Sequence, residues 1–308
     1  KLLPHLEEVV IAVLKSSFEI INKNNFVLFF DDLDVGFDTT NKDTVDNIVA
    51  LLRVTRDINN EVFNDIPGRA KVVILIRDDV DKYISDNYED TAKILASYSA
   101  PIDWYQDDYN INDSESELNI KKFIDLRIRN AFKNAQLPCL SNPWDSLVDK
   151  EENYAQKTSF KYILDHTLFR PRDLLLLFSF LETGNYQIPL DKKSVINLIS
   201  KYSSLLVKEL RNELVSFYSQ QEINQIIGFL KVLNNKPSYS SYDEAVSELT
   251  KEYRGPKKID DVLSDLFNRS VIGACSANNN YKFKYREPVN ECYNLEDKDS
   301  ILLHYGFR

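Results

Sequence analysis

Two runs of apolar residues, separated by one amphipathic helix, constrain the fold more than any other feature of this sequence. Residues 26–30 read FVLFF and residues 72–76 read VVILI, and neither run alternates with polar residues. Between them, residues 44–58 carry apolar side chains at helical spacing, and Asp43 or Thr44 can cap this helix. Apolar strands connected through a helix are typical of a parallel sheet that is covered on both faces. The sequence therefore predicts an α/β core.

Charged residues follow each of these strands. Asp31 and Asp32 come directly after the first strand, Asp34 and Asp38 follow close behind, and Arg77 comes after the second strand. Neighbouring carboxylates repel one another, so the cluster favours a bound cation or a role in proton transfer. An apolar strand that ends in an acidic pair is the Walker B pattern of P-loop nucleotide hydrolases. A strand that simply ends in a solvated acidic turn would show the same residues, and Arg77 could equally pair with a nearby aspartate.

The Walker B interpretation requires a phosphate-binding loop, G-x-x-x-x-G-K-[ST], before the first strand. The chain has seven glycines, and no two of them are five positions apart. Residues 6–22 have the apolar spacing of a helix that precedes this strand. The chain also starts at Lys1 and contains no methionine, so we expect the loop upstream of Lys1 or in a segment that is missing from this sequence. A protein that never binds nucleotide would lack the loop as well.

A second charged motif, RPRD at residues 170–173, predicts the start of a helix. Proline suits the first turn, Asp173 favours the positive end of the helix, and residues 174–178 supply a buried face. Arg170 and Arg172 at such a helix start could stabilise the charge of a phosphate. Alternatively, both arginines could pair with nearby carboxylates and fix the helix in place.

The rest of the chain predicts helices and a small C-terminal region that contains strands. Residues 118–135 predict a helix with a basic outer face, which is more often solvated than bound to nucleic acid. Helical patterns run from 193 to 252, and residues 259–267 predict a short amphipathic helix. Two strands around a turn at 278–280 then resemble a wing.

Composition narrows the classes of protein that fit. The net charge of −10 argues against a surface that coats nucleic acid. No apolar run approaches the roughly 20 residues that a membrane-spanning helix needs. Three widely spaced cysteines without a C-x-x-C pair fit a reducing cytoplasm, and three scattered histidines suggest no metal site.

Four stretches, taken in order, resemble bacterial P-loop ATPases of the AAA+/STAND superfamily, near the KAP group and the FunZ-like proteins. They are FFDDLDVGFD at 29–38, VVILIRDDVDKYI at 72–84, TLFRPRDLLLLFSFL at 167–181, and the tail from VIGACSANNN onwards. The resemblance implies an α/β ATPase core with a parallel sheet at residues 1–110, of which the N-terminal part is absent. It further implies a helical lid with the RPRD motif at 111–200 and a helical, winged-helix-like region at 201–308.

The resemblance also implies a role for each charged residue. Asp31 would hold Mg²⁺, Asp32 would be the catalytic carboxylate, and Arg77 would be a catalytic sensor of the γ-phosphate of ATP. Arg170 and Arg172 would bind the nucleotide. We therefore expect all of these side chains to line one cleft, with ATP and Mg²⁺ as cofactors. Relatives commonly have an arginine directly after D-D-L-D, whereas Val35 stands there in this chain, so no charge-sensing role is expected for that position.

The predicted function is therefore that of a cytoplasmic ATPase that acts as a switch or motor, and the resemblance suggests bacterial defence or DNA-linked stress as its setting. Its expected partner is nucleotide, with another protein or a second copy as a further candidate. Nucleic acid stays open, although the charge does not indicate it, and no membrane is expected. The alternative is a module on a degenerate P-loop fold that binds protein or DNA and does not hydrolyse nucleotide.

Overall fold

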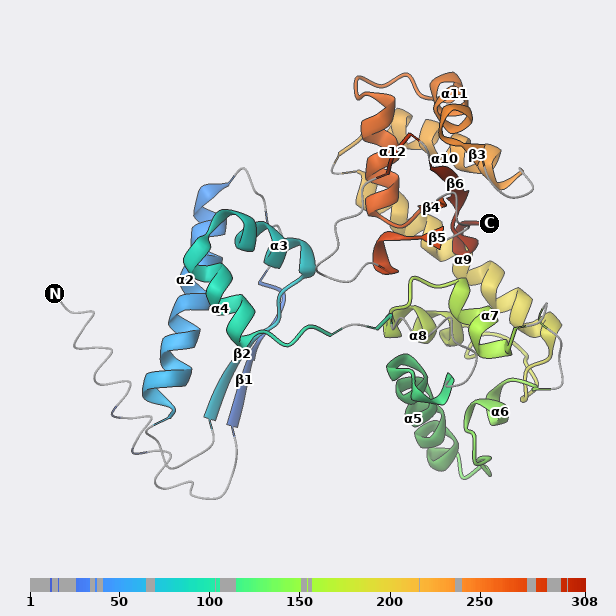
Figure 1. The fold of residues 1–308 in the computed structure, drawn as a ribbon. Coiled ribbons are helices and arrows are strands. Elements are labelled where there is room, and N and C mark those ends of the chain that lie inside the picture. The colour runs from blue at the N-terminus through green and yellow to red at the C-terminus, as the bar shows by residue number, and fades with distance from the viewer. Residues whose placement is uncertain are drawn as a thin grey trace. The chain divides into compact units, whose positions relative to one another are not determined.

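The computed structural model divides the chain into two compact units, unit 1 at Lys1–Ile102 and unit 2 at Asp103–Arg308 (Figure 1). The structure describes residues 12, 16, 26–33, 37, 41–64, 70–102, 104–105, 115–150, 154, 157–215, 217–235, 240–275, 281–286, 295–297 and 299–308. Most of the helix predicted at 6–22, the turn predicted at 278–280, and the carboxylates of Asp34 and Asp38 therefore lie outside the described residues.

Unit 1 contains two parallel strands and several helices. Strand β1 spans Phe26–Phe30 and strand β2 spans Ala70–Ile74, with Phe30 opposite Ile74. The helices are α2 (Lys42–Asp57), the π-helical turn η1 (Ile58–Val62) that continues it, α3 (Asp78–Asn87) and α4 (Glu89–Tyr98). The predicted parallel pairing is confirmed, although the second strand covers 70–74 instead of 72–76.

The core of unit 1 forms between the helices. One side of α2 supplies Val45, Ile48, Val49 and Leu52, and these pack with Val80 and Ile84 of α3 and Leu95 of α4. The cap of α2 is Asn41, whose side-chain oxygen accepts the N–H of Thr44 at 3.4 Å. The prediction of Asp43 or Thr44 as the cap is wrong because both residues already lie in the first helical turn.

Strand β1 is more exposed than the sequence predicts. Leu28 is 56% exposed and Phe29 is 60% exposed. Since successive strand residues point to opposite faces, both faces of β1 are open to solvent. Within the described part of unit 1, β2 is the strand that pairs with β1. The expectation of a sheet covered on both faces is therefore wrong for β1, because no described helix buries both of its sides.

Unit 2 is mainly helical. The first element that the structure describes in it is the 3-10 turn η3 (Glu115–Glu117). The helices that follow are α5 (Asn119–Asn134), α6 (Trp144–Leu147), α7 (Ser159–Asp165), α8 (Pro171–Ser179), α9 (Lys192–Leu214), α10 (Gln220–Asn234), α11 (Tyr242–Glu252) and α12 (Ile259–Asn268). The helices predicted at 118–135 and 259–267 agree with α5 and α12 to within one residue at each end.

A small antiparallel sheet lies near the C-terminus. Its strands are β3 (Ser240–Ser241), β4 (Ile272–Cys275), β5 (Tyr281–Lys282) and β6 (Ser300–Leu303), in the order β3-β6-β4-β5. The short helical turns η4 (Lys284–Arg286) and η5 (Tyr305–Phe307) accompany it. Strands β4 and β5 lie where the sequence predicts them, whereas β3 and β6 were not predicted.

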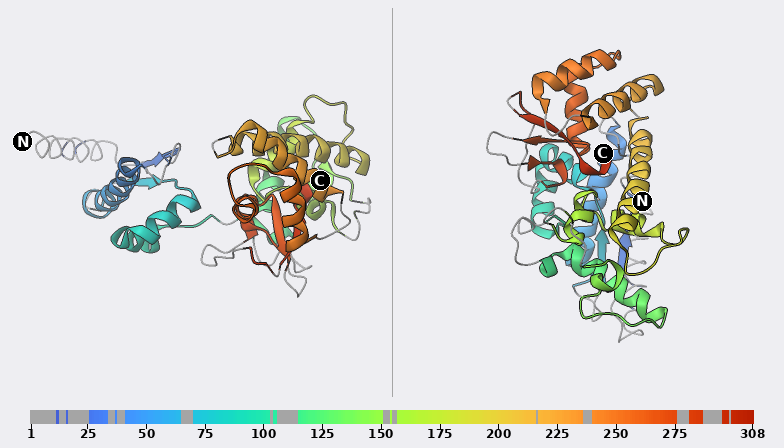
Figure 2. Two further views of the ribbon diagram at one scale, coloured as in Figure 1. Left: turned by 90° about the horizontal axis from the view of Figure 1, so that it is seen from above. Right: turned by 90° about the vertical axis from the view of Figure 1, so that its right-hand side faces the viewer.

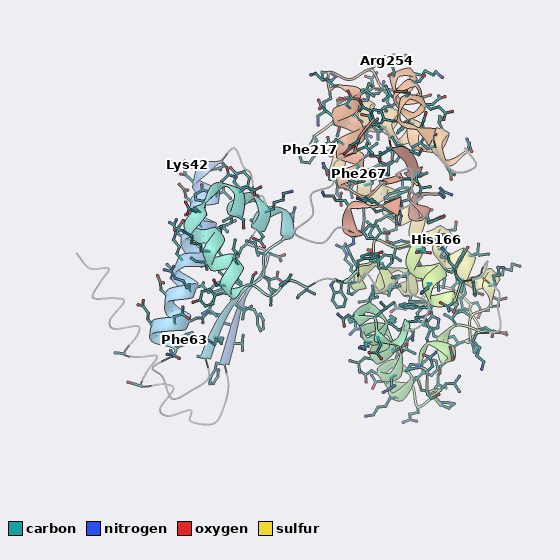
Figure 3. All side chains as sticks on the ribbon, in the orientation of Figure 1. Lys42, Phe63, His166, Phe217, Arg254 and Phe267 are labelled. Atoms are coloured by element: carbon teal, nitrogen blue, oxygen red, sulfur yellow. The ribbon has the colours of Figure 1, made fainter. Side chains whose placement is uncertain are left out.

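Two hydrophobic cores fill unit 2, and helix α9 contributes to both. The first core contains Val195 to Leu206 on the inner side of α9, and the second begins with Leu210. The domain boundary expected between 200 and 201 falls inside this continuous helix (Figure 2). Phe267 of α12 lies in the second core, whereas Phe217 is 57% exposed (Figure 3).

Candidate functional site

The acidic pair follows β1 in a sharp turn. Asp32 has a φ of 56°, a left-handed backbone conformation that few residues other than glycine adopt. Its backbone N–H donates to Oδ1 of Asp31 at 2.9 Å. Both aspartates are exposed, so the turn keeps two carboxylates in water at the end of an apolar strand.

Arg77 lies at the same edge of the sheet. The two strands are parallel, and the N–H of Leu75 donates to the carbonyl oxygen of Phe30 at 2.9 Å just beyond the paired residues. Asp31 follows Phe30 directly, and Arg77 comes two residues after Leu75, where its carbonyl accepts the first backbone N–H groups of α3. The carboxyl ends of both strands therefore carry the predicted site residues of unit 1, at the place where open α/β sheets bind ligands.

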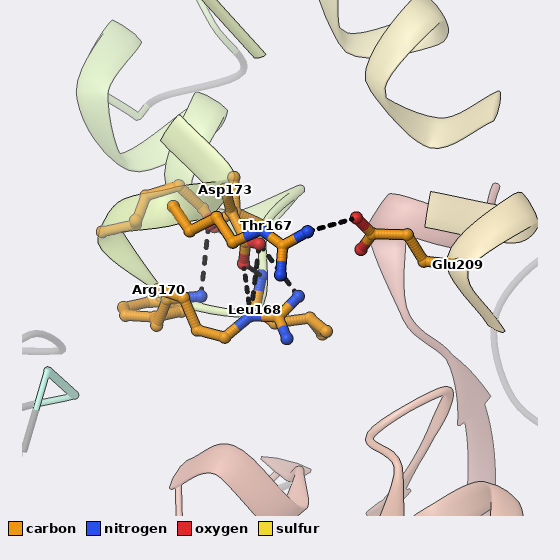
Figure 4. Close-up of polar contacts among 8 residues, drawn as sticks. Thr167, Leu168, Arg170, Asp173 and Glu209 are labelled. Carbon is orange, nitrogen blue, oxygen red and sulfur yellow. Dashed lines mark hydrogen bonds and ion pairs between the residues drawn. The ribbon is translucent and has the colours of Figure 1, made fainter. Parts of the chain in front are cut away.

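The RPRD motif begins α8, as the sequence predicts, with Pro171 in the first turn. Asp173 is fully buried, and Arg170 donates to it from Nη2 to Oδ1 at 2.9 Å and from Nε to Oδ2 at 3.1 Å (Figure 4). The N–H of Leu168 donates to the same carboxylate at 3.0 Å. Asp173 therefore ties the loop before α8 to the start of the helix, besides lying near its positive end.

The loop before α8 is held by further bonds. The hydroxyl of Thr167 donates to the carbonyl of Leu164 at 2.8 Å and accepts the N–H of Phe169 at 3.2 Å. Phe169 has a φ of 58°, which turns the chain toward Arg170. This turn directs the buried Phe169 side chain into the first core of unit 2.

The two arginines of the motif differ in how they are held. Burial opposes the charge on Arg170, but the hydrogen bonds and charge of Asp173 outweigh it and raise the pKa of Arg170. Arg172 is 73% exposed and reaches Glu209 of α9 through one contact of 3.3 Å (Figure 4). An exposed pair of this length is weak, so the guanidinium of Arg172 can exchange Glu209 for an anionic ligand.

Tyr202 and Glu209 are neighbours of the motif that sequence reasoning missed. Tyr202 is 1% exposed, and burial together with the charge of Asp173 raises the pKa of its hydroxyl. Both residues lie on α9, which packs against α8. Their seven-residue spacing places them on one side of a helix, but nothing in the sequence links that side to the RPRD motif.

The predicted site residues thus fall into two groups. Asp31, Asp32 and Arg77 belong to unit 1, whereas Arg170 and Arg172 belong to unit 2. Within each group the residues lie at one edge or one helix start. Whether both groups line a single cleft stays a prediction.

The carboxylates of unit 1 suit Mg²⁺ better than they suit a metal ion whose ligands all come from the protein. Among the described residues, no group of three or more His, Cys, Asp or Glu side chains could hold a metal ion. Mg²⁺ is usually bound through one or two carboxylates, with water and phosphate as its other ligands. Asp31 and Asp32 meet that requirement, but the sequence supplies no glycine-rich loop to cradle the phosphates.

Part of the chain matches the model of a known protein family. Residues 118–211 match the model of the FunZ-associated C-terminal helical domain. The matched residues run from α5 into α9 and include Arg170, Arg172 and the residues that pair with them. The match does not extend to Asp31, Asp32 or Arg77.

No curated protein and no solved structure matches the chain. In the part of the chain that the structure describes, no helix is both long enough and apolar enough to span a bilayer.

Proposed function

We propose that this chain is the Walker B half and helical lid of a cytoplasmic P-loop ATPase of the AAA+/STAND group. The observation that carries the proposal is the parallel pair β1 and β2, whose carboxyl edge bears Asp31, Asp32 and Arg77 in a chain that also holds a FunZ-associated domain. ATP hydrolysis would serve as a switch or motor, and the resemblance suggests bacterial defence or DNA-linked stress as its setting.

Each residue of unit 1 has a distinct proposed role. Asp31 would hold Mg²⁺, which when bound neutralises phosphate charge. Asp32, next to it and exposed, would accept the proton of the attacking water. Arg77 would stabilise negative charge on the transferred phosphate. Of the two lid arginines, we propose Arg172 as the phosphate ligand, because Asp173 already occupies Nε and Nη2 of Arg170.

We also propose a winged helix for residues 220–303. Helix α10, strand β3, helices α11 and α12, and strands β4 and β6 follow one another in the order of that fold. The sheet order, with β6 between β3 and β4, supports the same assignment. This region would transmit the nucleotide state to a partner.

The test uses the intact protein with its phosphate-binding loop. Asp32→Asn should still bind ATP with Mg²⁺ but lose about 100-fold or more in turnover, because an amide cannot accept a proton. Asp31→Ala should also weaken the Mg²⁺-dependent part of ATP binding. Asp86→Asn is the matched control, since Asp86 is exposed on α3 and away from the strand ends.

Two results would overturn the proposal. If Asp32→Asn turns over ATP at the wild-type rate, the role of the second carboxylate is wrong. If the wild-type protein binds no ATP with Mg²⁺ in calorimetry, the protein is an interaction module on a degenerate fold and not an ATPase.

A further inference from the structure

Helix α5 presents a basic face to solvent. The helix carries five cations and one carboxylate, Asp125. The exposed residues Lys122, Leu126, Arg129 and Lys133 lie on one side of the helix, with the exposed Arg127 at the edge of that side, and we call this surface the basic face. Leu126 within it is 58% exposed. A basic face with an apolar centre differs from the rest of a chain whose net charge is −10.

Most cations of the basic face have no carboxylate partner among the residues that the structure describes. Asp125 forms an ion pair with the buried Lys121 at 2.6 Å, and Lys122 forms one with Glu117 at 2.9 Å. Arg127 lies over the ring of Phe123 at 6.0 Å. Within the described residues, Arg127, Arg129 and Lys133 form no ion pair. These three cations are therefore the ones that we expect to meet a partner of opposite charge.

The opposite charge gathers on helices α11 and α12. Together these two helices carry seven carboxylates and a single lysine. Their exposed carboxylates include Asp243 and Glu244 in the first turn of α11 and Asp260 and Asp261 in the first turn of α12. We call this pair of helices the acidic helix pair.

The acidic helix pair does not suit DNA. In a winged helix, the second helix of such a pair enters the major groove and its neighbour approaches the phosphates. Affinity for DNA comes mainly from lysine and arginine side chains that neutralise phosphates. Here carboxylates would face those phosphates, so repulsion opposes this mode of binding and favours a basic protein surface.

The basic face and the acidic helix pair lie at opposite ends of unit 2 (Figures 1 and 2). Helix α9, with 23 residues, runs between the two cores that support them. A single chain therefore cannot place its own α5 against its own α11 and α12. Two chains can make this contact, because each one carries both surfaces.

We propose that the basic face of α5 binds the acidic helix pair of a second copy of this chain. Arg127, Arg129 and Lys133 would meet Asp243, Asp260 and Asp261, and Leu126 would be buried at the centre. The net charge of −10 opposes association at long range. At physiological salt the Debye length is about 8 Å, so that repulsion is screened while charges in contact still attract.

The test is sedimentation velocity of the full chain in about 0.15 M salt, the condition in which contact charges still act. We expect a concentration-dependent oligomer that dissociates in high salt. Arg127→Glu with Arg129→Glu should raise the apparent Kd at least about tenfold, because it places like charges in contact. Lys208→Glu with Lys231→Glu is the matched control, since these exposed lysines of α9 and α10 give the same change in net charge.

A mixing experiment separates this contact from a general effect of charge. A second variant, Asp243→Lys with Asp261→Lys, should also associate more weakly than the wild type when it is alone. Mixing it with Arg127→Glu/Arg129→Glu should restore association. In the mixture, the acidic α5 of one variant meets the basic α11 and α12 of the other, and the two unchanged surfaces also carry opposite charges. Circular dichroism of each variant checks that the helices are retained.

Three results would overturn the proposal. The first is a wild-type chain that stays monomeric at all concentrations tested. The second is an oligomer that the variants do not weaken, or that mixing does not restore. The third is loss of binding to a labelled oligonucleotide in Arg127→Glu/Arg129→Glu without any change in self-association, which would assign the basic face to nucleic acid. None of these outcomes depends on ATP hydrolysis.

Discussion

Arg170 and Asp173 form a salt bridge across the start of α8, with Nη2 and Oδ1 2.9 Å apart. The arginine side chain is 44% exposed, whereas the carboxylate is fully buried. The negative charge of Asp173 therefore stays in the interior, and its partner Arg170 extends to the surface, where water can solvate the guanidinium. This geometry makes Asp173 the structural anchor of the RPRD motif and leaves Arg172 for a ligand.

Asp173→Ala should destabilise unit 2. The change leaves the N–H of Leu168 and the guanidinium of Arg170 without their acceptor. We expect a loss of about 2–4 kcal/mol in the free energy of unfolding, less than for a fully buried pair because Arg170 is partly solvated. Urea unfolding measures it. Arg172→Ala should cost less than about 1 kcal/mol, and equal losses in both variants would contradict the anchor role.

The sequence predicted single helices and the β1–β2 pair better than it predicted the contacts between distant segments. Apolar periodicity and the RPRD motif placed α2, α5, α8 and α12 correctly, because such signals lie within one helix. The parallel pairing of β1 and β2 was also predictable, since two apolar strands joined through a helix permit few other arrangements.

Contacts between distant segments were not predictable from one sequence. Lys121 lies in the basic stretch of α5, yet it is 3% exposed and bonds to Asn142 at 3.1 Å, 21 positions away. Strand β6 at Ser300–Leu303 pairs with β3 and β4 across long stretches of chain. Such pairings depend on tertiary packing, which leaves no local pattern in the sequence.

Gly306 and Gly228 should respond to alanine in opposite directions. A Cβ at Gly306 in η5 would lie 2.5 Å from the backbone oxygen of His166, which cannot move without shifting α7. We expect Gly306→Ala to cost about 1–3 kcal/mol in the free energy of unfolding. At Gly228, inside α10, a Cβ would meet the flexible end of Glu252 at 3.1 Å.

Gly228→Ala should therefore stabilise the protein by up to about 1 kcal/mol, because alanine favours the helix over the unfolded chain. Thermal unfolding of both variants checks the pair. A stabilised Gly306→Ala variant would show that η5 does not dock closely against His166.

Ser219 should contribute measurably to stability as the cap of α10. Its hydroxyl accepts the N–H of Glu222, and the Glu222 carboxylate accepts the N–H of Ser219 at 2.9 Å, which completes a capping box. Ser219→Ala should cost about 1 kcal/mol. Ser204→Ala, the same change in the middle of α9, should be neutral or slightly stabilising because alanine is the better helix former. Denaturant unfolding that ranks Ser204→Ala as the more harmful change would contradict the cap.

His166 should make stability depend on pH below about 6.5. Burial lowers the pKa of His166, and this effect exceeds the opposing effect of the hydrogen bond to the carbonyl of Tyr162, which lies 2.8 Å from Nδ1. The unfolded chain, with an ordinary histidine pKa near 6.5, therefore binds the proton first as the pH falls. Since the unfolded state then holds more protons, the free energy of unfolding decreases with falling pH from about 6.5 down to the folded pKa.

The comparison that isolates this effect is the wild type against His166→Gln, unfolded in urea at several pH values between 7.5 and 5. His5 and His304 are common to both proteins, so their titration cancels in the difference. The wild type should lose more stability than the variant over this range, because glutamine does not titrate. Parallel curves for the two proteins would mean that His166 binds its proton equally well in the folded chain, and that its burial between α7 and η5 is looser than the structure indicates.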